Sequence, residues 1–257
     1  MRYFLRLSYN GTNFHGWQIQ PNAISVQQVL EESLSTVFRR EIAITGAGRT
    51  DTGVHAAEMY AHFDIDSPIN EKEKKIVSLN RLIGKDISIY DILEVEDDAH
   101  ARFDAVSRTY KYFITYQKNP FLYPFSFFSH RKFDIDKMNE ACEILKSTSD
   151  FTSFAKLHSD NKTNICKVST AKWDNLDFGK SDSYPSIPFS GIVFTITADR
   201  FLRNMVRAIV GTLVEVGSGK INLKDFSEII DSQDRCAAGN SMPAEGLFLW
   251  KIKYPYL

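Results

Sequence analysis

The segment SVQQVLEESLSTVF, residues 25–38, predicts the first helix of the fold. Its apolar residues recur at three- and four-residue spacing, which places them on one side of a helix. Ser25 and Gln28 have the spacing of a capping box, in which two side chains satisfy backbone N–H groups at a helix start. The preceding stretch YFLRLSY, residues 3–9, alternates and is rich in aromatic residues, so it predicts a strand. The chain thus begins with a strand and an amphipathic helix.

Four further elements and a loop follow in the first 100 residues. The pattern predicts strands at Glu41–Thr45, Met59–Ile65 and Ile87–Val95, a helix at Asn70–Ile83, and a loop with three glycines at Gly46–Gly53. The order β-α-β-β-α-β is that of the ferredoxin-like arrangement.

The remaining residues repeat this order with one extra helix. We expect strands at Arg108–Tyr116, Val168–Trp173, Gly191–Thr197 and Leu247–Tyr254, helices at Asp136–Lys146, Arg200–Val216 and Leu223–Ser232, and a mobile loop at Asn175–Pro188. The fold class is therefore α/β (α+β), with two ferredoxin-like, RRM-like halves at residues 1–100 and 101–257. Placed edge to edge, they would form one extended mixed antiparallel sheet with helices on one face. The other face would be an open cleft of the kind that binds RNA.

Composition narrows the class of protein. The 257 residues are 43% apolar and 25% charged, the balance of a soluble globular protein. Three distant cysteines without a C-x-x-C pair argue against a disulfide framework or a cysteine zinc site and favour a reducing cytoplasm. The N-terminal residues lack the apolar core of a signal peptide, and no apolar run approaches the ~20 residues of a membrane span.

Charge is unevenly distributed although the net charge is only −1. Residues 61–107 hold 6 Lys or Arg against 11 Asp or Glu, whereas residues 108–172 hold 11 against 6 and residues 200–220 hold 4 against 1. A shared basic face would attract a polyanion. An ordinary mixed surface explains the same numbers equally well.

The stretch GAGRTDTGVHA, residues 46–56, is the most unusual in the chain. Its glycines permit left-handed backbone and close approach, and Asp51 lies two residues from Arg49. Neighbouring positive charge would keep this carboxylate ionised, so that it could act as a nucleophile or a base. The alternative is that Asp51 merely caps a turn. His55, Glu58 and His62 weakly suggest metal ligands, but a loop followed by a strand would not bring them together.

Five motifs resemble those of the TruA family of tRNA pseudouridine synthases. They are FHGWQ (14–18), GRTDTGVHA (48–56), ARFDAVSRTYKY (101–112), FLRNMVRAIVGTL (201–213) and PAEGLFL (243–249). The resemblance implies a pseudouridine synthase fold and a homodimer that isomerises uridine to pseudouridine at positions 38, 39 and 40 of the tRNA anticodon stem–loop. It implies no cofactor and no metal.

The resemblance also implies roles for particular residues. Asp51 is the catalytic aspartate, expected as nucleophile, although attack on the ribose, attack on the base and action as a base all remain open. Arg49 would hold the flipped nucleotide, Tyr110 would stack on the uracil, Arg207 would pair with Asp51, and Leu247 would line the uracil pocket.

The residues alone leave ordinary alternatives. Tyr110 and Leu247 could pack in strands, and Arg49 could form a salt bridge. The spacing of Arg200, Arg203 and Arg207 predicts one basic helix face, with Arg200 and Arg203 as phosphate contacts; a solvated face is the alternative. For the whole chain, the other hypotheses are a non-catalytic tandem RNA-binding module, a pseudouridine synthase acting on other tRNA uridines, and an aspartate-nucleophile hydrolase.

Overall fold

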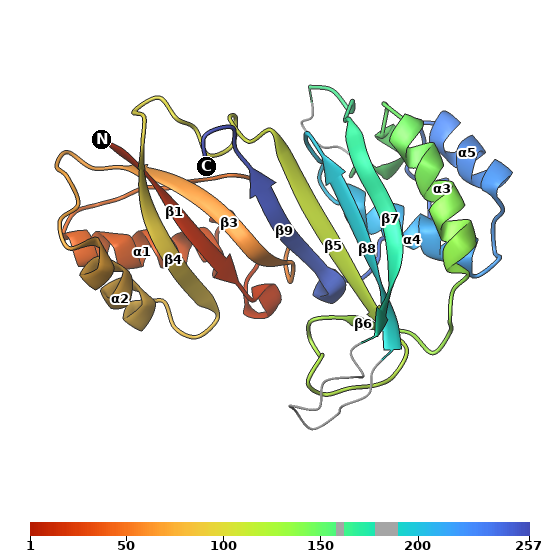
Figure 1. The fold of residues 1–257 in the computed structure, drawn as a ribbon, viewed down its shortest axis with the longest axis horizontal. Coiled ribbons are helices and arrows are strands. Elements are labelled where there is room, and N and C mark those ends of the chain that lie inside the picture. The colour runs from red at the N-terminus through yellow and green to blue at the C-terminus, as the bar shows by residue number, and fades with distance from the viewer. Residues whose placement is uncertain (158–161, 178–189) are drawn as a thin grey trace. The chain divides into compact units, whose positions relative to one another are not determined.

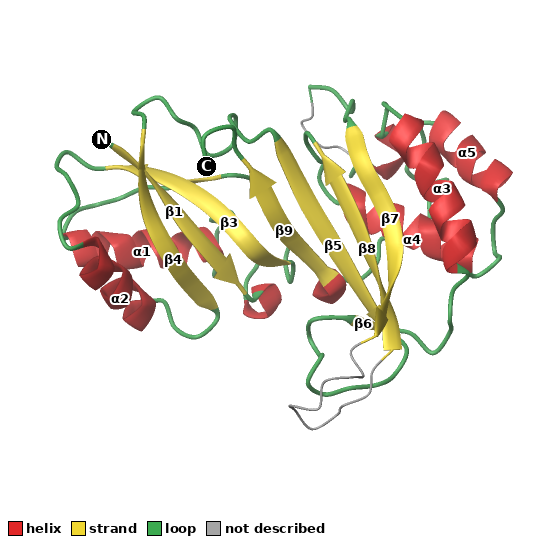
Figure 2. Ribbon diagram, in the orientation of Figure 1, coloured by secondary structure: helices red, strands yellow, loops and turns green. Residues whose placement is uncertain are grey.

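The computed structural model describes residues 1–157, 162–177 and 190–257. This part of the chain contains five α-helices and nine strands, which confirms the expected mixed α/β class (Figures 1 and 2). The chain forms two compact units, one comprising Met1–Arg108 with Phe248–Leu257 and the other Thr109–Leu247. No helix within the described ranges is long and apolar enough to cross a membrane.

The first unit has the strand order of a ferredoxin-like domain. β1 (Arg2–Tyr9) lies between β4 (Ile87–Val95) and β3 (His55–Asp64) and is antiparallel to both. The far edge of β3 pairs with β2 (Thr45–Gly46) and, in parallel, with β9 (Leu247–Lys253) at Phe248 and Leu249. The predicted β-α-β-β-α-β order is therefore present here, with β9 as an additional strand.

Two helices pack together on one face of this sheet: α1 (Val26–Phe38) and α2 (Lys72–Leu82) (Figure 1). The apolar stripe of α1 explains its position, because Leu30 and Leu34 are fully buried. The capping box is only half formed. Ser25 Oγ accepts from the Gln28 N–H at 3.2 Å, but the Gln28 side chain donates to Glu32 instead.

The predicted strand at Glu41–Thr45 is wrong except for its last residue. The N–H groups of Ile42 and Ile44 donate to Ser35 Oγ at 3.0 Å and to Glu31 Oε1 at 2.9 Å. Because side chains of α1 satisfy these backbone donors, this stretch follows the helix rather than a neighbouring strand.

The second unit contains strands in the order β5-β8-β7, with the short β6 beside β5. The bounds are Ser107–Thr115 for β5, Phe127–Phe128 for β6, Val168–Asp177 for β7 and Ser190–Ala198 for β8. Three helices that contact one another complete the unit: α3 (Ile135–Ser147), α4 (Met205–Gly217) and α5 (Leu223–Asp231). The boundaries of this unit fall within β5, at Thr109, and at the first residue of β9, Leu247. The rest of β9 therefore belongs to the first unit.

α4 begins five residues later than the sequence predicts. Asn204, directly before it, has a left-handed backbone with φ of 65°, which a continuous right-handed helix cannot contain. Arg200 and Arg203 therefore precede the helix, and the predicted basic face on one helix is wrong. Of the predicted mobile loop at Asn175–Pro188, the first three residues belong to β7, while 178–189 lie outside the described residues.

Candidate active site

Asp51 lies in the connection between β2 and β3, residues 47–54, which we call the Asp51 loop. Asp51 is half-buried and Arg49 is exposed, whereas Thr50 between them is buried. The Thr50 hydroxyl lies 2.9 Å from the Tyr9 hydroxyl on β1. One side of the loop is thus fixed to the sheet while Asp51 and Arg49 reach the surface.

The FHGW residues hold the Asp51 loop through their backbone. Trp17 N–H donates to the Thr50 carbonyl at 3.2 Å, and Gly53 N–H donates to the Phe14 carbonyl at 3.3 Å. Gly16 has φ of +85°, and a Cβ at this position would clash with the Thr50 carbonyl oxygen. Only glycine meets both conditions. The family resemblance identifies this motif, but the residue pattern alone does not reveal that it holds the Asp51 loop.

A second support comes from Arg108, at the start of β5. Its guanidinium donates to the carbonyls of Ala47 at 3.1 Å and Ala105 at 2.9 Å. Asp51 also closes a turn, because its own carbonyl accepts from Val54 N–H at 3.1 Å. The turn-cap interpretation is therefore compatible with a chemical role, since the turn uses the backbone of Asp51.

The two histidines of the weak metal pattern have structural partners. His55 Nδ1 accepts from Gly11 N–H at 3.0 Å, and its ring stacks on Phe248 at 4.6 Å between centroids. His62 Nδ1 accepts from Ala101 N–H at 3.1 Å. These contacts explain both side chains as supports of the first unit.

In the second unit, β5 carries Tyr110 and Tyr112 on the same face. The half-buried Tyr110 meets Phe201 edge to face, with ring centroids 5.0 Å apart at 81°. Tyr112 is fully buried, and its hydroxyl donates to the Pro243 carbonyl at 2.9 Å. Burial strongly raises the pKa of Tyr112, so this hydroxyl stays protonated.

Arg207 lies in the first turn of α4 and fixes the segment that precedes β9. Its Nε donates to the Met242 carbonyl at 2.6 Å, and Met242 N–H donates to the Arg207 carbonyl at 3.0 Å. Asn204 adds a bond from its amide to Ser241 Oγ at 2.6 Å. The segment ends at Leu247, which is buried.

Arg200 and Arg203 occupy the connection between β8 and α4. Arg203 is exposed and Arg200 half-buried. Asp199, directly before Arg200, has a structural role here. Its carboxylate accepts from the backbone N–H groups of Lys167 at 2.8 Å and Arg200 at 2.7 Å.

The seven expected site residues fall into two groups. Asp51 and Arg49 belong to the first unit, and the second unit holds Tyr110, Arg200, Arg203, Arg207 and Leu247. Within the second unit, the charge of Arg207 opposes the rise in the pKa of Tyr112 and that of Glu245 adds to it. The expected joining of both groups at one site stays a prediction.

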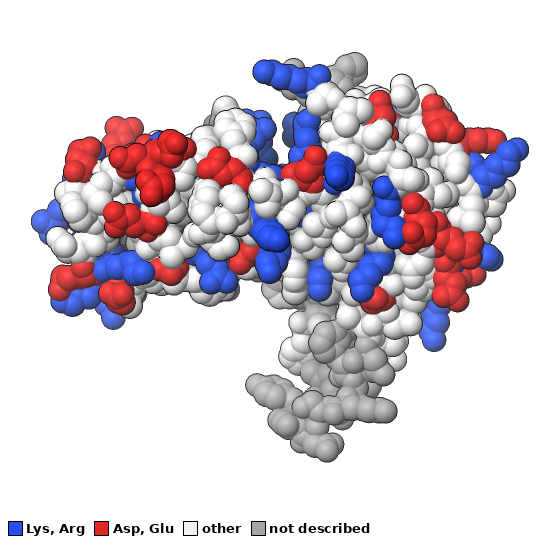
Figure 3. Space-filling model, turned by 45° about the horizontal axis from the view of Figure 1, so that its top comes forward, with Lys and Arg blue, Asp and Glu red and all other residues white. Residues whose placement is uncertain are grey.

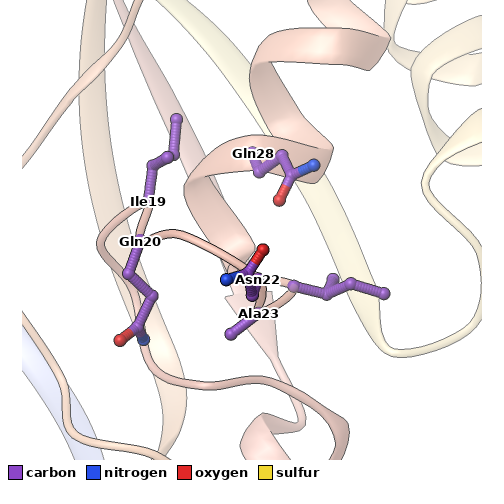
Figure 4. A pocket seen from close by; sticks show the side chains of 6 residues that line it. Ile19, Gln20, Asn22, Ala23 and Gln28 are labelled. Carbon is purple, nitrogen blue, oxygen red and sulfur yellow. The ribbon is translucent and has the colours of Figure 1, made fainter.

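A hollow of about 400 Å³ lies in the first unit, beside the start of α1 (Figure 4). Its lining consists of neutral side chains: Ile19, Gln20, Asn22, Ala23, Ile24 and Gln28. It offers no acid or base for chemistry. Figure 3 shows acidic side chains gathered at the left end of the view, over the first unit, and a second acidic group at the right end, over the second unit.

Comparison with known proteins gives matches over nearly the whole chain. The model of a family described as tRNA pseudouridine synthase matches residues 7–104 and 141–255. The tRNA pseudouridine synthase A of Bacteroides fragilis is 53% identical over 254 residues, covering 99% of this chain and 96% of that protein. Those of Porphyromonas gingivalis and Bacillus licheniformis are 52% and 37% identical, each covering 99% of this chain and 97% and 99% of their own lengths.

The protein thus combines a mixed α/β fold with an aspartate on a glycine-containing loop that backbone hydrogen bonds hold in place. The family whose model matches the chain is a family of isomerases. The chain belongs to the tRNA pseudouridine synthase family. It is therefore an enzyme rather than a non-catalytic RNA-binding module.

Proposed function

We propose that this isomerase converts uridine to pseudouridine at positions 38, 39 and 40 of the tRNA anticodon stem–loop. The observation that carries the proposal is the Asp51 loop, in which Phe14, Trp17 and Arg108 hold the backbone around a surface-reaching carboxylate. The five TruA-like motifs and the tRNA pseudouridine synthase A relatives support the choice of substrate.

The reaction is an internal rearrangement. The bond between N1 of uracil and C1′ of ribose breaks, the bound base turns, and C5 bonds to C1′. C5 loses a proton and N1 gains one, so atoms balance without an oxidant or a second substrate. A uridine inside a stem or loop must first leave its stack, at a cost of a few kcal/mol. Contacts to the RNA backbone would offset this cost.

The remaining residues have roles in this scheme. Arg49, exposed beside Asp51, fills the space left by the flipped nucleotide. Tyr110 stacks on the uracil and Leu247 forms an apolar wall. Arg207 pairs with Asp51, and Arg200 and Arg203 contact phosphates without forming a helix face.

The proposed arrangement of the whole enzyme follows the element order. Residues 1–100 and 101–257 form two related halves, and the enzyme binds the anticodon arm. A homodimer in the cytoplasm binds one tRNA across both subunits. The β4-β1-β3-β2 and β5-β8-β7 strand orders of the two units support the related halves.

The test replaces Asp51 by Asn, which keeps the turn because the turn uses the backbone carbonyl. Release of tritium from C5-labelled tRNA should fall about 1,000-fold or more. Asp66→Asn is the matched control, because Asp66 is an exposed aspartate paired with Arg40 on the surface. Turnover by a folded Asp51→Asn enzyme within tenfold of the parent would reject the assignment. Transcripts with cytidine at positions 38–40 should release no tritium.

A further inference from the structure

The connection between β5 and β6 carries two highly exposed aromatic side chains. In this segment, residues 117–125, which we call the aromatic loop, Phe121 is 73% exposed and Tyr123 is 67% exposed. Figure 1 shows it extending past the strand ends at the bottom of the view. Single exposed apolar residues are common, but two large rings two residues apart form a surface that favours a partner.

The loop presents these rings from a hydrogen-bonded turn. The Asn119 side chain accepts from Phe121 N–H at 2.9 Å. The Asn119 carbonyl accepts from Leu122 N–H at 3.2 Å and Tyr123 N–H at 3.3 Å. Phe125 N–H then donates to the Leu122 carbonyl at 2.6 Å. The turn therefore determines the backbone that carries both rings before any partner is bound.

The sequence on both sides of the aromatic loop carries charged side chains of positive sign only. No Asp or Glu occurs between Asp104 and Asp134, a stretch that contains five Lys or Arg. Of these, Lys118, Arg131 and Lys132 are exposed. Exposed rings among cations are the combination that binds single-stranded nucleic acid, since bases stack on the rings and phosphates meet the cations.

We infer that the aromatic loop is a second tRNA contact, on which unpaired bases other than the isomerised uridine stack. The inference rests on the proposed tRNA substrate. Six residue steps lead from Tyr110 along β5 to Tyr116, just past the end of the strand, and span about 20 Å at ~3.3 Å per residue. One flipped nucleotide at Tyr110 does not span this distance, so the loop acts on affinity and not on the chemical step.

The test measures tRNA binding and turnover of a Phe121→Ser/Tyr123→Ser enzyme. Binding is read with a transcript that has cytidine at positions 38–40, so that the result does not depend on isomerisation. The Kd should rise about fivefold or more, the range expected for the loss of base stacking. KM should rise with it while kcat stays within twofold of the parent.

Tyr90→Ser is the control, because Tyr90 is also an exposed ring, at 53%, but lies outside the five motifs and within the acidic residues 61–107. Its Kd should match that of the parent. An unchanged Kd in the double variant, or an equal rise in the control, overturns the inference even if isomerisation is confirmed. A change of oligomeric state that accounts for the whole rise in Kd also overturns it, because the loop would then bind a second copy. Failure of the parent enzyme to bind tRNA rejects the proposed function and this inference together.

Discussion

Tyr110 and Tyr112 lie two residues apart on β5, yet they differ in burial and in their contacts. Tyr112 is fully buried and its hydroxyl holds the Pro243 carbonyl, whereas Tyr110 keeps part of its ring at the surface beside Phe201. The buried tyrosine therefore stabilises the segment that leads to Leu247. The half-buried one keeps part of its ring exposed, as the proposed stacking on uracil requires.

Replacing Tyr112 by Phe removes this buried hydrogen bond and leaves the ring in place. We expect the free energy of unfolding to fall by about 1 kcal/mol, because the Pro243 carbonyl loses its donor. Tyr90→Phe is the control, since the Tyr90 hydroxyl bonds to Ser8 at an exposed site and its loss should cost much less. Urea denaturation measures both. Equal losses in the two variants would contradict this account.

Residue patterns predicted the position of Asp51 but not the contacts that hold it. The glycines and the Arg-Thr-Asp sequence lie together in the chain, so a motif reveals them. The bond from Tyr112 to Pro243 joins residues 131 positions apart, and Arg207 meets Met242 across 35 positions. A single sequence contains no signal for such pairs, because the intervening fold creates them.

At the scale of elements, the FHGW segment matters because it is irregular. Its N–H and carbonyl groups bond to the Asp51 loop and to α1 instead of to a strand; for example, the Gly16 carbonyl accepts from Val26 N–H at 3.2 Å. The segment thereby links the start of α1 to the loop that carries Asp51. A change at Gly16 should reach the candidate active site through this link.

Gly16→Ala should reduce turnover by more than the accompanying loss of folding stability accounts for. Alanine meets two costs at this position, a left-handed backbone and a clash with the Thr50 carbonyl, so the Asp51 loop must move. Gly84→Ala is the control. Gly84 has a similar φ of +74°, but its added Cβ meets nothing within 4 Å. It should lose about 1 kcal/mol of stability and retain turnover. Equal kcat values for the two folded variants would show that the clash does not reach Asp51.

The type and order of the elements were predictable because the spacing of apolar residues reflects which side of each element is buried. Helix α3 is an example. All four residues predicted for its inner side, Met138, Ala141, Cys142 and Leu145, are fully buried. Element ends were less predictable. The start of α4 depends on the left-handed Asn204, and Ile42 and Ile44 bond to side chains of α1. Both outcomes depend on tertiary contacts that compete with local preference.

At the scale of the whole molecule, the small net charge is the sum of an acidic and a basic part of the chain. The acidic surplus lies in residues 61–107 and the basic surplus in residues 108–172. The basic stretch contains the aromatic loop, as an RNA-binding surface requires. The acidic stretch contains His62 and His100, whose environment connects folding of the first unit to pH.

His62 is buried between Phe4 and His100, with ring centroids 6.2 Å and 4.6 Å away. Burial, with the positive charge of Arg2, lowers the pKa of His62 from 6.5 to about 4. Burial also lowers the pKa of His100. Between pH 6.5 and 4 the unfolded chain therefore binds protons that the folded chain does not, and the free energy of unfolding must fall as pH falls.

The effect should be visible above pH 5, because the reference pKa of an aspartate side chain is only about 4. Urea denaturation at pH 7, 6 and 5 should show a steady loss of stability in the parent enzyme. His62→Gln should show a weaker pH dependence, because glutamine cannot be protonated and its side-chain oxygen can still accept from Ala101 N–H. Part of the dependence should remain in this variant, owing to His100. Identical pH dependence in the two proteins would mean that His62 can be protonated without disturbing the folded first unit.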